Sequence, residues 1–296
     1  MRWYIAILYH LLRGIGRLPL PALHAIGTAL GWLLLHTPNA VRSKARATLS
    51  IVITEFGAET RQSLLKSAMF EAGKSVFEVC KIWSGSAEDA LMLVREARGV
   101  ELLDQALAAR RGVIIAAPHL GCWELLNFWV CSRTPFAIAY RPPRQPALEP
   151  LLLRARGGLA AEQVRAEGAA GVRTLYKRLI DGGVVGILPD QQPKQGEGEF
   201  APFFGTQALT MVLLSRLARR TGATVLFAFA ERLPHGAGYR VQILPAPAGI
   251  ADPDLPTAVA ALNRGVEECV RRAPAQYMWH YKRYSIRPDG ETQQWY

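Results

Sequence analysis

Cysteine and histidine are too sparse and too scattered in this sequence to suggest a disulfide framework or a metal centre. The four cysteines include no C-x-x-C pair, and none is spaced from a histidine as the ligands of a zinc site are. The six histidines are dispersed along the chain. We therefore expect reduced thiols, no bound metal, and a protein that faces the cytoplasm.

Acidic residues are also in deficit. The chain has 24 Asp and Glu against 35 Lys and Arg, which gives a net charge of +11 and a pI near 9.8. Half of its residues are hydrophobic, and the mean hydropathy is +0.09. This combination of basic and apolar character is typical of a protein at an anionic membrane surface. Nucleic acid is not an expected partner, because the sequence has no nucleic-acid-binding motif and its apolar N-terminus would be unexplained.

The N-terminal region lacks a segment long enough to be an obvious membrane span. Residues 18–35 contain no Asp, Glu, Lys or Arg, but a run of this length is at the short end of the roughly 17 to 25 residues that a spanning helix needs. Pro19 and Pro21 shorten the usable helix further. A small-residue cleavage site is absent, so a removed signal peptide is not expected. We predict a retained helical membrane anchor over residues 1–36; the alternative is a buried hairpin of helices packed on the core.

No linker or internal repeat divides the rest of the chain, and we predict a single α/β domain over residues 37–296. Apolar runs alternate with helical periodicity, which predicts a central, mostly parallel or mixed sheet flanked by helices. The expected strands are residues 113–117, 136–140, 184–188, 224–230 and a more exposed strand at 239–244. The expected helices are residues 39–83, 91–110, 172–181, 209–220 and 256–272.

The most informative stretch is residues 112–126, Gly-Val-Ile-Ile-Ala-Ala-Pro-His-Leu-Gly-Cys-Trp-Glu-Leu-Leu. Its apolar run has the continuous hydrophobicity of a strand buried on both faces, and Pro118 ends the pairing because it lacks a backbone donor. His119 would then stand at the carboxyl end of a strand, the edge of an open α/β sheet at which ligands bind. Gly121 would permit a sharp turn into the helix that carries Glu124.

His119 and Glu124 could form a general-base dyad. On one helix they could not meet, so the turn must fold Glu124 back toward the imidazole. A carboxylate bonded to one ring nitrogen would leave the other free to take a proton from a hydroxyl. No nucleophile-elbow pattern is present and Cys122 has no second base nearby, which favours direct transfer over a covalent intermediate. The alternative is a buried histidine capped by a nearby carboxylate.

Three further stretches are expected where strands end on the same edge of the sheet. Such an edge collects polar and aromatic side chains that can contact a ligand. The stretches are Tyr140-Arg141-Pro142, followed by Arg154 and Arg156; Leu188-Pro189-Asp190-Gln191-Gln192; and Ala201-Pro202-Phe203-Phe204-Gly205, with Ala208 to Thr210 opening a helix.

The ordered set of motifs carries more information than any one of them, since a His-x4-Glu box alone is weak. The set comprises His119 to Glu124, Tyr140 to Pro142, Arg154 to Arg156, Pro189 to Gln191, Pro202 to Gly205, Ala208 to Thr210, Thr221 to Ala223, Gln276 to Trp279 and Lys282-Arg283. In this order and over nearly the full length, it resembles the late acyltransferases of bacterial lipid A biosynthesis. These form the lauroyl and myristoyl acyltransferase family within the lysophospholipid acyltransferase superfamily.

The resemblance implies a glycerolphosphate acyltransferase-like fold and transfer of a fatty acyl chain from an acyl carrier protein thioester to a hydroxyl of a lipid A precursor. The reaction would take place at the cytoplasmic face of the bacterial inner membrane, without a metal or a cofactor. The implied partners are acyl carrier protein, the glycolipid acceptor and an anionic membrane surface.

Carried over residue by residue, the resemblance makes His119 the base and Glu124 its orienting partner. Arg156 would hold a phosphate or sugar acid of the acceptor, or else pair with a structural carboxylate. Asp190 would position substrate or Arg156, or else only end a strand. The remaining candidate substrate-binding residues are Arg141, Arg154 and Gln191, together with Phe203, Phe204 and Gly205, which would line the acyl path or, as we favour, pack in the core beside it.

Three other functions stay open. The protein could acylate another lysophospholipid-like or bacterial lipid, could hydrolyse a thioester with the same dyad, or could be a membrane-bound interaction protein that has lost activity. The intact pair of His119 and Glu124 argues against the last. The sequence specifies neither the acyl chain length nor the acceptor hydroxyl.

Overall fold

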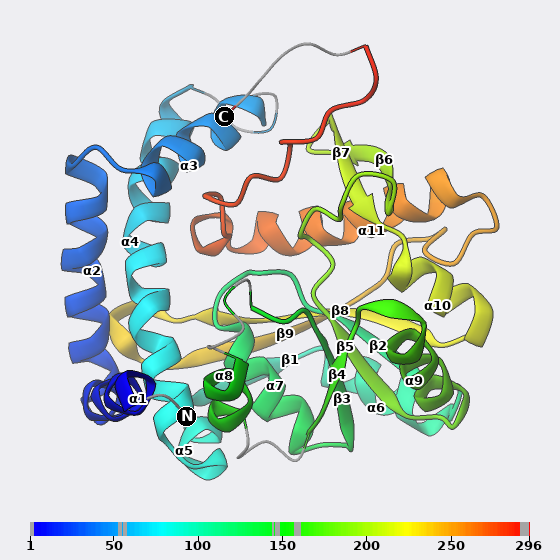
Figure 1. The fold of residues 1–296 in the computed structure, drawn as a ribbon, viewed down its shortest axis with the longest axis horizontal. Helices are drawn as coiled ribbons and strands as arrows, with labels where there is room; N and C mark the ends of the chain where they lie inside the picture. The colour runs from blue at the N-terminus through cyan, green and yellow to red at the C-terminus, as the bar shows by residue number, and fades with distance from the viewer. Residues whose placement is uncertain are drawn as a thin grey trace.

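A mixed sheet of seven strands lies at the centre of the computed structural model, which describes residues 3–52, 55, 58–143, 145, 149–156, 161–290 and 296 (Figure 1). The strands are β1 (Val94–Arg98), β2 (Val113–Ala116), β3 (Phe136–Tyr140), β4 (Ala161–Arg165), β5 (Val184–Ile187), β8 (Thr224–Arg232) and β9 (Tyr239–Pro245). Their order is β1-β9-β8-β2-β5-β3-β4, and all neighbours are parallel except β8 and β9. The expected single α/β domain with a mixed central sheet is confirmed.

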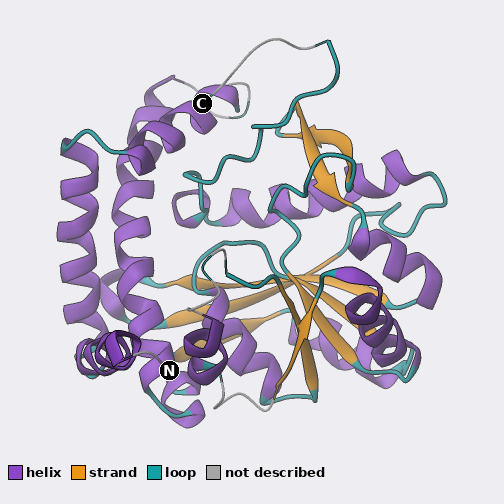
Figure 2. Ribbon diagram, in the orientation of Figure 1, coloured by secondary structure: helices purple, strands orange, loops and turns teal. Residues whose placement is uncertain are grey.

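Helices cover both faces of this sheet (Figure 2). The described helices are α1 (Trp3–Gly16), α2 (Leu20–His36), α3 (Ala40–Ile51), α4 (Ala58–Ser84), α5 (Ala87–Leu91), α6 (Val100–Ala108), α7 (Trp123–Cys131), α8 (Glu149–Ala155), α9 (Gly168–Ile180), α10 (Leu213–Thr221) and α11 (Leu255–Arg272). Alternate residues of β2 point to opposite faces. Val113 and Ile115 join a core with α6 and α7, whereas Ile114 and Ala116 join a core with α9, α10 and α11. The strand is thus buried on both faces, as its unbroken apolar run predicted.

Helices α2 and α4 lie side by side at the left of Figure 1. Glycines allow their backbones to approach closely: a Cβ added at Gly73 would lie 2.1 Å from the carbonyl oxygen of Gly27 and 2.7 Å from the backbone nitrogen of Gly31. Small residues four positions apart on one helix are a common way to pack two apolar helices. The contact uses only one face of α2.

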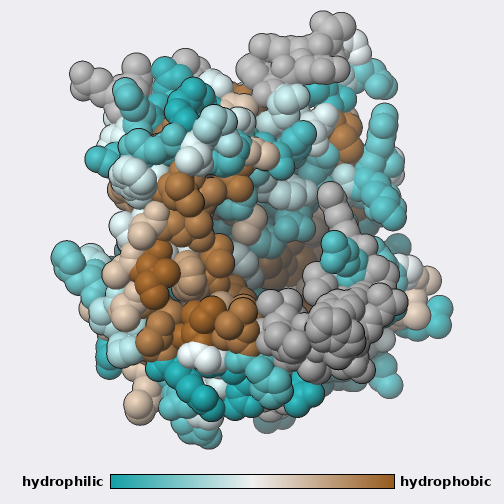
Figure 3. All heavy atoms as spheres, turned by 60° about the vertical axis from the view of Figure 1, so that its left-hand side comes forward, coloured by the Kyte–Doolittle hydropathy of each residue, from teal (hydrophilic) through white to brown (hydrophobic). Residues whose placement is uncertain are grey.

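The opposite face of α2 is apolar and exposed. Ile26 is 42 % exposed, Trp32 56 % and Leu33 49 %, and Figure 3 shows hydrophobic surface over this part of the molecule. Within the described residues, no one helix has the length and apolarity required to cross a bilayer; segments His10–Gly16 and Leu20–His36 meet the criterion only as a pair bent by 112°. The N-terminal anchor over residues 1–36 stays a prediction.

Residues 91–110 do not form the expected single helix but divide into β1 and α6. Gly99 separates them, since its φ is +73° and a Cβ there would lie 2.2 Å from the carbonyl oxygen of Ile243. β1 pairs with β9 at the edge of the sheet. Tertiary pairing therefore overrides the helix propensity of its arginine, glutamate and alanine residues.

Other boundaries also differ from the sequence expectations. Residues 39–83 divide into α3 and α4, and residues 209–211 complete a strand before α10 begins. That strand, β7 (Thr206–Met211), forms an antiparallel hairpin with β6 (Gly198–Phe203). β9 is buried along most of its length because β1 and β8 flank it, so its predicted exposure is wrong. The remaining expected strands and helices are confirmed to within a few residues.

Candidate active site

His119 stands where β2 ends, as the sequence predicted: Pro118 follows the strand and a turn leads into α7. Gly121 makes this turn possible. Its φ is +61°, and an added Cβ would lie 2.0 Å from the carbonyl oxygen of Ala230. The turn therefore lies directly against β8.

The segment that follows α11 holds the turn from the other side. The Gly121 N–H donates to the carbonyl of Gln276 at 3.2 Å, and the Met278 N–H donates to the carbonyl of His119 at 3.1 Å. The side chain of Gln276 is itself fixed, because its amide donates to the Arg232 carbonyl at 2.9 Å and accepts from the Arg232 N–H at 2.7 Å. Residues far apart in sequence thus fix the backbone of His119.

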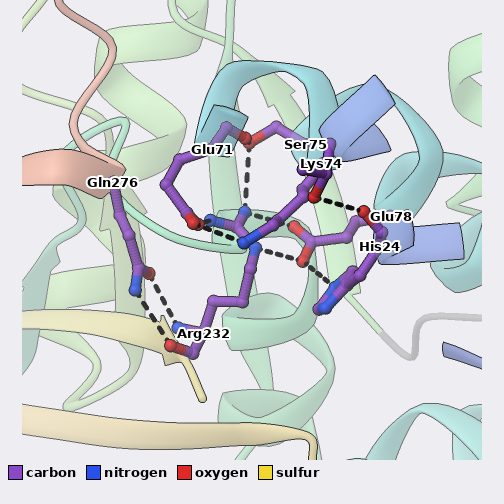
Figure 4. A network of polar contacts seen from close by, with 8 residues as sticks. His24, Glu71, Lys74, Ser75, Glu78, Arg232 and Gln276 are labelled. Atoms are coloured by element: carbon purple, nitrogen blue, oxygen red, sulfur yellow. Dashed lines mark hydrogen bonds and ion pairs between the residues drawn. The ribbon is translucent and has the colours of Figure 1, made fainter. Parts of the chain in front are cut away.

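Arg232 rests on a buried polar cluster, shown in Figure 4. Its guanidinium pairs with Glu71 and Glu78 and donates to Ser75 Oγ at 3.1 Å, while His24 Nε2 lies 2.7 Å from the Glu78 carboxylate. Burial raises the pKa of Glu78, but the charge and hydrogen bonds of Arg232, with a smaller contribution from His24, outweigh it and lower this pKa to about 2. The cluster ties α2 and α4 to the end of β8 that supports the turn at His119.

Asp190, rather than Glu124, is the carboxylate that meets the imidazole. His119 Nδ1 lies 2.7 Å from Asp190 Oδ1, and the His119 backbone N–H donates to Oδ2 at 2.9 Å. The expected contact between Glu124 and the ring is therefore corrected. β5 is the sheet neighbour of β2, so the residue that follows β5 falls beside His119 although 71 positions separate the two in sequence.

The second ring nitrogen of His119 faces the side-chain amide of Gln191, with 3.1 Å between Nε2 and the amide nitrogen. An ionised carboxylate can only accept, so Nδ1 carries the proton that is donated to Asp190. An amide N–H that donates to Nε2 matches a ring in which Nε2 carries a lone pair and no proton, and an acceptor hydroxyl would replace this amide contact. This is the tautomer that a general base requires.

The environment of Asp190 keeps its carboxyl ionised. Burial raises the pKa of Asp190, but the positive charge that His119 carries when its ring is protonated and the hydrogen bonds from its ring and backbone outweigh burial, and the pKa lies below its ordinary value. A carboxylate in this position also stabilises the imidazolium that forms when the ring takes a proton.

Glu124 forms a separate buried pair with Arg156. The guanidinium spans both carboxylate oxygens, with 2.5 Å from Nη2 to Oε1 and 3.1 Å from Nε to Oε2. The Trp83 indole N–H donates to Oε2 at 3.2 Å, and Arg156 Nη1 donates to Gln163 at 3.3 Å. Of the two roles considered for Arg156, the structure shows the ion pair with a buried carboxylate. Five donors in a planar fork suit this bidentate contact.

A cavity of about 360 Å³ opens beside His119. Of the predicted substrate-binding residues, Arg141, Arg156 and Gln191 line it, whereas Arg154 lies exposed on α8 and is not part of its wall. The other lining residues include Trp123, Ile138, Tyr140, Leu152, Val172, Ile187, Glu197, Met211, Val212 and Leu213. Its mixture of apolar walls with a few polar groups suits a ligand with a hydrocarbon chain and a polar head.

Phe203 ends β6, Phe204 and Gly205 form the turn into β7, and none of the three lines this cavity. Both rings are buried; Phe203 lies 6.3 Å from the ring of Tyr277, and Phe204 lies 5.8 Å from that of Trp279. The favoured expectation, core packing beside the site, is what the structure shows.

Sequence reasoning did not identify several residues that shape the site. The Trp123 ring lies 5.3 Å from that of His119, and Trp83 reaches Glu124 from the end of α4. Gln276 belonged to a recognised motif but had no assigned role. Position within the His119 stretch could have singled out Trp123, whereas the other two act through contacts between distant segments, which one sequence does not reveal.

Comparison with known proteins now adds to this geometry. The family model of the bacterial lipid A biosynthesis acyltransferases matches residues 1–285. The chain belongs to this family. It is therefore an acyltransferase, and the resemblance drawn from its motifs is confirmed.

Two lipid A acyltransferases match over most of the chain, and an acyltransferase named for another lipid matches over about half of it. The lipid A biosynthesis lauroyltransferase of Escherichia coli (strain K12) is 26% identical over 275 residues, 93% of this chain and 89% of the relative. The palmitoleoyltransferase of the same organism is 27% identical over 280 residues, again 93% and 89%. A phosphatidylinositol mannoside acyltransferase of Mycobacterium tuberculosis (strain ATCC 25618 / H37Rv) is 28% identical over 160 residues, 53% of this chain and 50% of the relative.

Proposed function

We propose that this acyltransferase moves a fatty acyl chain from an acyl carrier protein thioester to a hydroxyl of a lipid A precursor, with His119 as general base. The observation that carries the proposal is the orientation of the imidazole: Nδ1 is held by Asp190, and Nε2 is turned to the lined cavity. The names of the full-length relatives support the lipid A acceptor.

The reaction proceeds in one transfer. Nε2 takes the proton of the acceptor hydroxyl as its oxygen attacks the thioester carbonyl carbon, and Asp190 stabilises the resulting imidazolium. The carbon–sulfur bond then breaks, and the leaving thiolate receives the proton from the ring. Cys122 is unsuited to form an acyl-enzyme, because burial raises the pKa of its thiol and keeps it protonated.

Glu124 acts in this scheme through Arg156. The pair joins α7, which follows the turn at His119, to the residue that follows α8, and Arg156 also lines the cavity. Arg141, exposed at the same cavity, is better placed to meet a phosphate of the acceptor, because its guanidinium has no carboxylate partner among the described residues.

The reaction is placed at the cytoplasmic face of the inner membrane. The exposed apolar face of α2 and the net charge of +11 both suit a bilayer that carries anionic lipids. In this arrangement residues 1–36 anchor the domain formed by residues 37–296.

A second acceptor class has support from one comparison. The mycobacterial relative is named for phosphatidylinositol mannoside, a different lipid, although it matches only about half of the chain. The family chemistry is therefore compatible with other polyol lipids, and the acceptor has to be tested directly.

The test combines the purified protein in detergent with acyl carrier protein bearing a labelled acyl chain, and with a lipid A precursor or phosphatidylinositol mannoside in parallel. Mass spectrometry should show one added acyl chain on the lipid A precursor. Product on the mannoside alone would move the protein to the second acceptor, and free fatty acid without any acylated lipid would indicate a thioester hydrolase.

A further inference from the structure

A second hollow adjoins the catalytic cavity, between α9 and α10. It encloses about 650 Å³ and has a largely apolar floor. Val172, Val212 and Leu213 line both this groove and the cavity beside His119. The two spaces therefore lie next to each other, and these three side chains form the wall between them.

Basic side chains border the groove on both helices. Arg173 on α9 and Arg216 on α10 are exposed and line it, and Arg220 lies at its end. Among the described residues, none of these three arginines is paired with a carboxylate; the ion pair nearest to them in sequence, Arg178 with Glu162, is 3.9 Å long. Arg220 is in the last turn of α10, where a cation also favours the helix dipole. Arg173 and Arg216 lie within their helices and lack that explanation.

The position of the groove selects the class of partner. Figure 1 shows α9 and α10 on the side of the molecule opposite to α2, whose exposed apolar face is the proposed membrane surface. An anionic lipid would reach the domain from the α2 side. A basic surface that faces away from the bilayer suits a soluble acidic protein, because opposite charges steer association and fix orientation.

We propose that α9 and α10 form the docking surface for the acidic carrier protein that delivers the acyl chain. The arginines contact acidic side chains of the carrier, and the groove receives the pantetheine arm and leads its thioester toward His119. This inference rests on the proposed function, since it assumes a protein-bound acyl donor. It implies that the two substrates enter from opposite sides, the lipid from the membrane and the carrier from the cytoplasm.

The experiment reverses one charge on each helix, in the double variant Arg173→Glu/Arg216→Glu of the full-length protein. The Michaelis constant for acyl carrier protein thioester should rise at least tenfold at low salt, and the rise should shrink as salt screens the wild-type contact. Acyl-pantetheine, which lacks the carrier protein, serves as a second acyl donor. The variant's fold-increase in Michaelis constant should be at least ten times larger for the carrier thioester than for acyl-pantetheine. The matched control, Arg111→Glu/Arg264→Glu, changes the net charge equally at exposed positions outside the groove.

Each outcome has a defined meaning. Equal Michaelis constants of the groove variant and the control variant for the carrier would overturn the docking surface. The proposal would also fail if the groove variant lost binding to anionic vesicles while its Michaelis constant for the carrier stayed unchanged. If wild type transfers nothing from the carrier to lipid, the proposed function itself fails. Should the double Glu variant not fold, as judged by thermal unfolding, Arg173→Gln/Arg216→Gln provides the same comparison with a smaller charge change.

Discussion

At the residue scale, the proposed catalysis depends on which carboxylate holds the imidazole of His119. Asp190 bonds both the ring and the backbone of His119, so Asp190→Asn should favour the wrong tautomer. We expect kcat to fall by roughly ten-thousandfold, the loss seen when the acid of a Ser-His-Asp triad is made an amide. Steady-state assays of the folded variant measure this, with the exposed Asp104→Asn as control. A kcat within a few-fold of wild type would rule out Asp190 as the partner.

Glu124 and Arg156 should behave as one unit in stability measurements. Glu124→Gln leaves a buried guanidinium without its counter-charge, which typically costs about 3–5 kcal/mol, whereas replacing both partners removes the unpaired charge. We expect Glu124→Gln/Arg156→Met to be destabilised by less than the sum of the two single variants. Chemical unfolding of all four proteins gives the coupling free energy. Additive losses would show that the contact contributes no coupling.

At the scale of strands and helices, the order of the strands explains why the sequence predicted the position of His119 but not the carboxylate that contacts it. The unbroken apolar run of β2 and Pro118 after it place His119 correctly at the carboxyl edge, and Gly121 turns as expected. Both Asp190 and Glu124 were recognised as site residues. Choosing between them required knowing that β5 is adjacent to β2, and a single sequence does not reveal which strands are neighbours.

The strands that the sequence did not predict also depend on pairing between distant segments. β1 contains arginine, glutamate and alanine, and β6 contains glycine and proline, residues with little β propensity; each of these strands forms because a partner pairs with it. The cluster of Arg232 with Glu71 and Glu78 also joins segments more than 150 positions apart. Local patterns identify the buried strands and the turn at His119, whereas contacts between distant segments determine what packs against them.

The packing of α2 on α4 can be tested at Gly73. A Cβ there would lie 2.1 Å from the Gly27 carbonyl oxygen, so Gly73→Ala must separate the helices. We expect a loss of about 1–3 kcal/mol in the free energy of unfolding, as for other overpacked sites. The control is Gly14→Ala on α1, where an added Cβ meets nothing within 4 Å and alanine improves helix propensity. Equal stability of the two variants would contradict the close helix contact.

The whole molecule presents an apolar surface on one side and a basic groove on the other. If the exposed face of α2 meets the bilayer, Ile26→Glu and Leu33→Glu should each lower the fraction bound to vesicles of phosphatidylethanolamine and phosphatidylglycerol, because a charge is costly at a lipid-facing position. Ile180→Glu is the control, since Ile180 is 52 % exposed and ends α9, a helix on the side of the molecule opposite to α2 (Figure 1). Flotation of the three variants measures the effect. Equal flotation of all three would place the membrane contact elsewhere.

The entire account depends on His119 as the base that activates the acceptor hydroxyl. The most direct measurement is the turnover of folded His119→Ala with acyl carrier protein thioester and lipid A precursor, followed by product mass. We predict a decrease of roughly a hundredfold to ten-thousandfold, as expected for a lost general base. Because His119→Ala leaves the buried Asp190 carboxylate without the imidazole, some loss of stability is expected, and thermal unfolding must show that the variant is folded at the assay temperature. Turnover close to that of wild type in a correctly folded His119→Ala protein would contradict the mechanism.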